Sequence, residues 1–320
     1  MKKIFFLFLS SLFLAASYGG RLEAASKVYK VGVTVIVSHP ALEEDQRGFE
    51  QALKDAGLSV KYDYQNAQGE MSNAQTIAQK FRDERVDLVH AIATPTSQAA
   101  VKVIKDIPIV YSSVTDPVDA GLVKTMGPDG RNVTGVSDAW PIYMQIKLYH
   151  EMLPSAHKWG TIYNAGDANS LVNIGKTKKA MAELGLKLVE VTVSNSNEVY
   201  TAAQSLVGRV DAIYITSDNT VVSAMGSVAK VANQNKIPLF AGDVGSVPRG
   251  ASVALGFNYY QVGYAAGKKA AKILKGEAKP GDIPSGYAEN LSLHLSLVNA
   301  RKQGLAIADK YIRQAEKVYR

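Results

Sequence analysis

Small polar residues gather in eight short segments of this 320-residue chain, and each segment directly follows an apolar run. The segments are rich in Ser, Thr, Asn and Asp and poor in Lys and Arg. Hydroxyl groups and the free N–H groups of a helix start suit a carboxylate, whereas Asp116, Asp218 and Asp243 could face an ammonium group. Tyr64 and Tyr163 could add an aromatic wall. This chemistry fits an amino acid better than a phosphate or a nucleotide.

The candidate ligand-binding residues are the polar and aromatic side chains of these segments, together with one proline. They are His39, Tyr64, Thr94, Pro95, Thr96, Thr115 and Asp116 in the first half of the chain, and Tyr163, Asn164, Asn169, Ser170, Asp218, Asn219 and Asp243 in the second. A purely structural alternative exists, because Ser, Thr, Asn and Asp at a helix start commonly act only as N-caps. Asp116 precedes Pro117 and could only shape a turn, and the tyrosines could belong to the core.

Signatures of catalysis and of metal binding are missing from the sequence. His39, His90, His150, His157 and His294 show no metal-binding spacing. The chain has no cysteine, which removes disulfides, thiolate metal sites and cysteine nucleophiles. It also has no glycine-rich nucleotide motif and no serine-nucleophile elbow. These features favour a binding protein without metal or cofactor, and an enzyme of similar α/β shape is the alternative.

The elements that would position these residues are repeated along the chain. Residues 209–220 repeat the pattern of residues 85–96. Each segment begins with Arg-Val-Asp and continues with an apolar run and a small polar loop. An Ile-Pro pair and a second apolar run follow each copy, at Ile107-Pro108 and Ile237-Pro238. Two similar α/β halves in one chain predict a cleft between two lobes, where small ligands tend to bind.

Apolar runs alternate with amphipathic segments throughout both halves, which predicts parallel sheets covered by helices. The expected strands are 31–37, 60–64, 86–92, 109–111 and 133–136, then 159–163, 188–193, 210–215, 239–241 and 253–255. The fold class is therefore α/β, with two similar doubly wound parallel-sheet lobes joined by a hinge. Helices at 143–152 and 261–274 cross between lobes, which divides the chain into 26–138 plus 259–290 and 139–258 plus 291–320.

The start of the chain has the pattern of a secretory signal. Lys2-Lys3 precedes the apolar run 4–16, and small residues at Ala24-Ala25 suit a cleavage site. We expect residues 1–25 to be removed and, with no cysteine to carry a lipid anchor, the mature protein to be periplasmic. The formal charge is +7, and its densest cluster, 176–179, fits a solvated helix face. No focused basic stripe indicates nucleic-acid binding, and we expect a monomer.

A series of segments across the whole mature chain resembles the substrate-binding proteins of ABC transporters, in the group described as tryptophan and tyrosine binders. The matching segments are His39–Leu42, Tyr64–Gly69, Ala78–Phe81, Ala91–Pro95, Val114–Val118, Asn132–Asp138, Tyr163–Ser170, Ser205–Gly208 and Asp218–Thr220. The chain departs from the family at Ala165 and Asp167, where members often have Tyr-Asn-Pro-Gly-Glu-Ala-Asn-Ser. The stretch 140–159, with its two tryptophans, is also unusual.

The resemblance implies a type I periplasmic-binding-protein fold, capture of a small solute, and delivery to a membrane permease with its ATPase. It also implies a pocket that includes His39, Thr94, Pro95, Asp116, Asn164, Asn169, Ser170, Asp218 and Asn219. An aromatic amino acid is the expected ligand, and closure of the hinge on that ligand is the expected mechanism. Two alternatives remain, a sensory module that feeds a membrane receptor and a binder of a sugar or nucleoside on the same fold.

Overall fold

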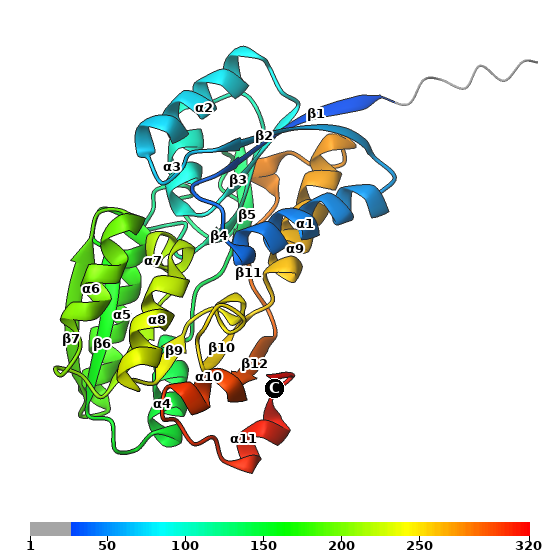
Figure 1. Ribbon diagram of the computed structural model, residues 1–320. Coiled ribbons are helices and arrows are strands. Elements are labelled where there is room, and N and C mark those ends of the chain that lie inside the picture. The colour runs from blue at the N-terminus through cyan, green and yellow to red at the C-terminus, as the bar shows by residue number, and fades with distance from the viewer. Residues whose placement is uncertain (1–26) are drawn as a thin grey trace, which may run out of the picture.

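The computed structural model describes residues 27–320 as two α/β lobes, each built on its own sheet (Figure 1). The predicted signal segment, 1–25, lies outside the described residues. The strands of the first sheet are β1 (Val28–Val35), β2 (Ser59–Asn66), β3 (Leu88–Ile92), β4 (Ile109–Val114), β5 (Val133–Ser137) and β11 (Gly286–Tyr287). They lie in the order β11-β5-β4-β3-β1-β2, and every neighbouring pair is parallel.

The second sheet is parallel except at one edge. Its strands are β6 (Lys158–Asn164), β7 (Lys187–Val193), β8 (Ala212–Ile215), β9 (Leu239–Ala241), β10 (Val253–Phe257), β12 (Leu291–Ser296) and β13 (Lys317–Tyr319). They lie in the order β13-β12-β10-β9-β8-β6-β7, and β12 runs antiparallel to β10. The prediction of wholly parallel sheets misses this edge. Strand β10 ends at the side of the sheet that faces the cleft, where the chain leaves for the first lobe. The chain returns from the first lobe at the same side and enters β12 there, so β12 must run antiparallel to β10.

Helices cover both faces of each sheet, so the doubly wound fold predicted from the sequence is confirmed. They are α1 (Pro40–Asp55), α2 (Met71–Asp83), α3 (Thr94–Val103) and α9 (Tyr259–Leu274) in the first lobe, and α4 (Ile142–Met152), α5 (Ala168–Glu183), α6 (Val199–Ser205), α7 (Asn219–Ser223), α8 (Met225–Asn235), α10 (Leu297–Lys302) and α11 (Asp309–Gln314) in the second. The packed pairs are α1 with α9, α2 with α3, α4 with α5, and α6 with α8. No helix within residues 27–320 has both the length and the apolar character needed to cross a membrane.

The sequence repeat corresponds to a repeated structural device. Asp87 accepts a hydrogen bond from the backbone N–H of Lys30 at 2.7 Å, and Asp211 accepts one from the backbone N–H of Lys158 at 2.8 Å. Each aspartate lies just before its strand, β3 or β8, and fixes the start of the neighbouring strand, β1 or β6. The aspartate near the start of each repeated segment therefore has a structural role, which is to hold two neighbouring strands together.

The helices α1 and α9 touch through their backbones, because glycines occupy the contact. A Cβ atom on Gly263 would stand 1.7 Å from the carbonyl oxygen of Asp45, and one on Gly48 would stand 1.9 Å from that of Tyr260. Figure 1 shows the two helices side by side. The pair forms one unit, and the first residues of both helices lie at the cleft.

Three segments carry the chain from one lobe to the other: 139–141, Asn258 and 288–290. Neither lobe is a continuous stretch of chain. The first lobe takes its elements from 28–137 and 259–287, and the second from 142–257 and 291–319. That the two lobes move as separate rigid bodies stays a prediction.

Candidate functional site

An enclosed cavity lies between the lobes, at the carboxyl ends of the parallel strands, where open α/β sheets usually bind ligands. The first lobe lines it with His39, Ala41, Leu42, Ser113, Thr115, Asp138 and Tyr259, and the second with Asn169, Ser217, Asn219, Val222 and Asp243. With the lobes as they stand, the cavity has room for about one water molecule. An amino acid could therefore enter only if the lobes separate.

Six polar atoms of these lining residues are buried without a hydrogen-bond partner. They are His39 Nδ1 and Nε2, Asp138 Oδ1, Asn169 Oδ1, Asn219 Nδ2 and Asp243 Oδ1. Buried polar atoms are nearly always paired, so each exception asks for an explanation. A ligand with hydrogen-bond donors and acceptors in this cavity would provide one.

Two carboxylates, one on each side of the cavity, share the same arrangement. Asp138 accepts a hydrogen bond from the Tyr259 hydroxyl at 2.7 Å, and Asp243 accepts one from the Ser246 hydroxyl at 2.6 Å. In each case the second carboxylate oxygen has no partner. Burial, with a smaller contribution from Asp45, raises the pKa of Asp138 to about 6, and burial also raises the pKa of Asp243. Both carboxylates would be stabilised by a cation between them.

The cavity supplies no cation of its own. Burial lowers the pKa of His39 to about 4, although the neighbouring Asn219 amide opposes the shift, so the ring is neutral near pH 7. Arg249 lies close enough to affect His39 and Asp243, but its guanidinium donates to the carbonyls of Val222 and Ser223 at 2.8 and 2.7 Å. The lining therefore combines two carboxylates with neutral hydrogen-bonding groups.

A buried network holds the first-lobe wall in place. Asp45 accepts hydrogen bonds from the hydroxyls of Ser112, at 2.7 Å, and of Ser113. The Ser112 hydroxyl also contacts His90 Nε2 at 2.7 Å, and the His90 ring stacks on Phe49. Ser113 has a φ of 55°, in the left-handed region that non-glycine residues rarely adopt. Asp45 thus stabilises an unusual backbone conformation at the cavity.

A second network lies behind the second-lobe wall and contains three of the predicted site residues. Asp218 accepts hydrogen bonds from the backbone N–H of Asn164 at 2.7 Å and from the Ser170 hydroxyl at 2.6 Å. Its other oxygen caps α7 by accepting from the backbone N–H of Val221 at 2.8 Å. Asn164, Ser170 and Asp218 do not line the cavity, but they hold the helix starts that carry Asn169 and Asn219 into it.

The other candidates fall into two groups. His39, Thr115, Asn169, Asn219 and Asp243 line the cavity. The structure places Tyr64, Thr94, Pro95, Thr96, Asp116 and Tyr163 outside its lining.

Each candidate outside the lining has a local structural role or position. Tyr64 is 49% exposed and donates to Glu50, and Tyr163 donates to Glu190. Asp116 caps a turn by accepting from the backbone N–H groups of Val118 and Asp119, which is the alternative that its sequence position allowed. Thr94, Pro95 and Thr96 are buried in the first turn of α3, where Thr96 donates back to a carbonyl of the preceding strand.

Four polar lining residues were missed as individual candidates: Ser113, Asp138, Ser217 and Tyr259. Ser113 and Ser217 belong to two of the eight small polar segments, 112–117 and 217–220, that were predicted to lie at the cleft. Asp138 ends the segment Asn132–Asp138 that resembles the family, and Tyr259 lies where the chain was predicted to return to the first lobe; neither was a candidate by its side chain. The signal for Asp138 was present, since it directly follows the buried strand β5, and Asp243 follows the buried strand β9 after one glycine.

Comparison with known proteins identifies the family. A family model described as ABC transporter substrate binding protein matches residues 30–319. The tyrosine-binding protein of Clostridioides difficile (strain R20291) is 41% identical over 273 residues, which are 84% of this chain and 79% of that protein. Members of this family bind substrates for transport and are not enzymes by kind.

Solved structures agree with this assignment. An ABC domain from Streptococcus pneumonia in complex with L-Trp gives a TM-score of 0.87 at 30% identity, covering 91% of this chain and 100% of that chain. The ligand-free, open structure of a substrate binding protein with adhesive properties from Clostridium difficile gives a TM-score of 0.67 at 38% identity, covering 91% and 99%. The resemblance predicted from the sequence is therefore confirmed, and this chain belongs to the family of ABC transporter substrate-binding proteins.

Proposed function

We propose that this protein captures an aromatic amino acid in the periplasm and delivers it to the membrane permease of an ABC transporter. The observation that carries the proposal is the pair Asp138 and Asp243, which contributes one unpaired carboxylate oxygen from each side of a single enclosed cavity. An ammonium group between them would satisfy both oxygens. Only a ligand that spans the two lobes can make this contact.

The remaining lining residues suit the rest of an amino acid. The Asn219 amide is an unpaired donor, and Asn169 lies in the first turn of the 16-residue helix α5, where a carboxylate is favoured. Leu42, Val222 and the ring of Tyr259 offer an apolar surface for the side chain. An aromatic side chain is supported by the relative named as tyrosine-binding and by the relative solved with L-Trp.

The proposed mechanism is closure of the lobes on the ligand. The chain superposes better on the tryptophan-bound relative than on the open, ligand-free one, although it is less identical in sequence to the former. Since the relative described as open and ligand-free is the one that superposes less well, this difference supports a present arrangement that is more closed than that open one. A ligand that contacts both lobes shifts the population from open to closed through its higher affinity for the closed state.

The test is calorimetric titration of protein that has been unfolded, dialysed and refolded to remove any carried ligand. We expect L-Trp, L-Tyr or L-Phe to bind. Indole-3-propionate, which lacks the ammonium group, should bind at least about 100-fold more weakly, because it leaves both carboxylates unpaired. Binding of a sugar or nucleoside, with no binding of any aromatic amino acid, would contradict the proposed ligand.

Ligand affinity should fall as the pH is lowered from 7 to 5. Protonated Asp138 cannot pair with an ammonium group, and its pKa of about 6 lies inside this range. Proton uptake by one group of that pKa weakens binding about tenfold between pH 7 and pH 5. His39, with a pKa of about 4, stays neutral throughout, and the charges of the amino acid do not change.

The control for this pH dependence is Asp138→Asn, which removes the titrating group. Its affinity should be lower at every pH and should vary less between pH 5 and pH 7. Any pH dependence that remains in this variant is attributed to Asp243, whose pKa burial also raises. An affinity that rises on acidification would mean that the ligand does not need these carboxylates in charged form.

A further inference from the structure

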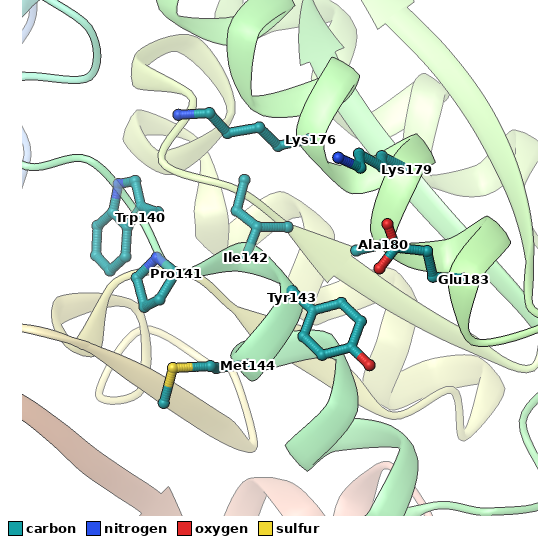
Figure 2. Close-up of a pocket in the computed structure, with 9 residues that line it drawn as sticks. All are labelled: Trp140, Pro141, Ile142, Tyr143, Met144, Lys176, Lys179, Ala180 and Glu183. Atoms are coloured by element: carbon teal, nitrogen blue, oxygen red, sulfur yellow. The ribbon is translucent and has the colours of Figure 1, made fainter.

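Helix α4 carries exposed side chains on one side and buried polar ones on the other. Tyr143 and Met144, drawn beside its first turn in Figure 2, are 44% and 56% exposed and line a groove between α4 and α5. Gln145 and Tyr149 lie one turn apart on a single face of the helix, and both are fully buried. Side chains of this kind are buried completely only when their polar groups are paired. Their partners therefore indicate what the two residues do.

Tyr149 bonds to the second sheet at the point where two of its strands part. Strands β9 and β10 pair at two positions, the last of which is Ala241 with Ala254. Beyond that pair, the Tyr149 hydroxyl donates to the carbonyl of Ala241 at 2.7 Å and accepts from the backbone N–H of Leu255 at 2.7 Å. The hydroxyl thus bridges β9 and β10 where their own ladder has ended.

Gln145 makes a second bridge between the same strands. Its Nε2 donates to the carbonyl of Gly242, just after β9, at 3.1 Å and to the carbonyl of Leu255 in β10 at 2.6 Å. Its Oε1 accepts from the Tyr214 hydroxyl of β8 at 2.5 Å. Both donors and the acceptor of the amide are used, which fixes its orientation. The amide therefore also fixes the direction of the Gly242 carbonyl.

The two bridges lie directly behind Asp243. The bonded carbonyls of residues 241–242 immediately precede Asp243, which contributes the second-lobe carboxylate to the cavity. Gly256 of β10 leaves space for this backbone, since a Cβ atom there would stand 2.5 Å from the Gly242 carbonyl oxygen. Burial raises the pKa of Tyr149, and the negative charge of Asp243 adds to the shift, so the two side chains are close enough to interact. A movement of either bridge would therefore move Asp243.

We propose that Gln145 and Tyr149 are positioning residues for Asp243. Neither lines the cavity, so they act on the ligand only through the backbone that they hold. By bridging the parted ends of β9 and β10, they direct the unpaired oxygen of Asp243 toward the ammonium group of the ligand. This inference rests on the proposed function and assigns part of its affinity to a helix on the far side of the sheet.

The test is a double-mutant cycle between the bridge and the carboxylate. Calorimetric titration with the tightest-binding aromatic amino acid is carried out on the wild type, Tyr149→Phe, Asp243→Asn and the double variant. Tyr149→Phe should weaken binding about tenfold, because the buried carbonyl of Ala241 and N–H of Leu255 lose their partner and the strand ends shift. In the Asp243→Asn background, the same change should alter the affinity less than about twofold, because the group that it positions is already gone.

Tyr111→Phe is the matched control, since it removes the hydroxyl of another buried tyrosine, which bonds to Ser285 at 2.5 Å in the first lobe. It should leave the affinity unchanged. Gln145→Met keeps the side-chain length but lacks the amide, and it should show the same dependence on Asp243 as Tyr149→Phe. Equal losses in both backgrounds, or no loss with Tyr149→Phe, would overturn the proposal. A wild-type protein that bound no amino acid would refute the proposed function, and this inference with it.

Discussion

Asp243→Asn lowers the affinity of the protein for its amino acid by about 100-fold or more, which corresponds to at least about 2.7 kcal/mol. The free oxygen of Asp243 is buried in the cavity and has no partner in the protein. When one member of a buried charge pair is removed, the other remains buried and unpaired, and the cost is typically about 2–5 kcal/mol. Calorimetric titration with the tightest-binding aromatic amino acid measures the loss.

The same variant should not lose stability when the protein is empty. Burial raises the pKa of Asp243, which means that the charged form is disfavoured in the closed protein. An amide at this position keeps an oxygen that can accept from Ser246 and removes the buried charge. We expect the empty variant to melt at the wild-type temperature or above, so weak binding will not be confused with loss of the fold.

The matched control is Asp116→Asn. Asp116 was a sequence candidate of the same chemical type, but its carboxylate accepts from the backbone N–H groups of Val118 and Asp119 and lies outside the cavity lining. This change should leave the affinity within about twofold, because turn contacts of this kind act on local stability. The reverse pattern, with Asp116→Asn abolishing binding and Asp243→Asn harmless, would show that the ligand lies elsewhere.

Gly263→Ala destabilises the protein by about 2–3 kcal/mol and lowers its melting temperature by about 5–10 °C. The new methyl group would stand 1.7 Å from the carbonyl oxygen of Asp45, and the carbonyl carbon lies 2.5 Å away. Both are backbone atoms of α1, so no side-chain rotation relieves the clash and the two helices must separate. Thermal unfolding followed by circular dichroism measures the effect.

Gly175→Ala is the control for helix propensity. Gly175 also lies inside a long helix, α5, but a Cβ atom there would meet nothing within 4 Å. Alanine forms helices better than glycine, so this variant should be stabilised by up to about 1 kcal/mol. If the two variants melted alike, the close backbone contact between α1 and α9 would be disproved.

The two-lobed architecture could be predicted from the sequence because it depends on local patterns repeated many times. Short apolar runs such as 88–92 and 212–215 became fully buried strands, with helices between them. The antiparallel strand β12 could not be predicted in this way, because its direction depends on how the chain crosses between lobes and leaves no local pattern. Its burial pattern, with Ser292, Leu293, Leu295 and Ser296 buried, does not reveal its direction.

The candidate site was predictable at the level of segments but less so at the level of side chains. Loops after buried strands had to meet at the cleft, and five candidates line the cavity. Tyr64 does not, because β2 is the outermost strand of its sheet and the hydroxyl pairs with Glu50 on α1. Asp138 lines the cavity but was overlooked, because its position at the boundary between the lobes was interpreted as hinge although it directly follows a buried strand.

The crossings between the lobes make each half of the protein depend on the other during synthesis. The first lobe needs α9 to cover α1 and β11 to complete its sheet, yet both come after residue 258, when most of the second lobe has already been made. A nascent chain that ends at residue 258 would leave the glycine surface of α1 without its partner and the outer edge of β5 unpaired. Such edges and exposed faces invite aggregation. Neither lobe can therefore be produced as a simple truncation, and the time between the first and last elements of the first lobe is when the chain most needs protection from other chains.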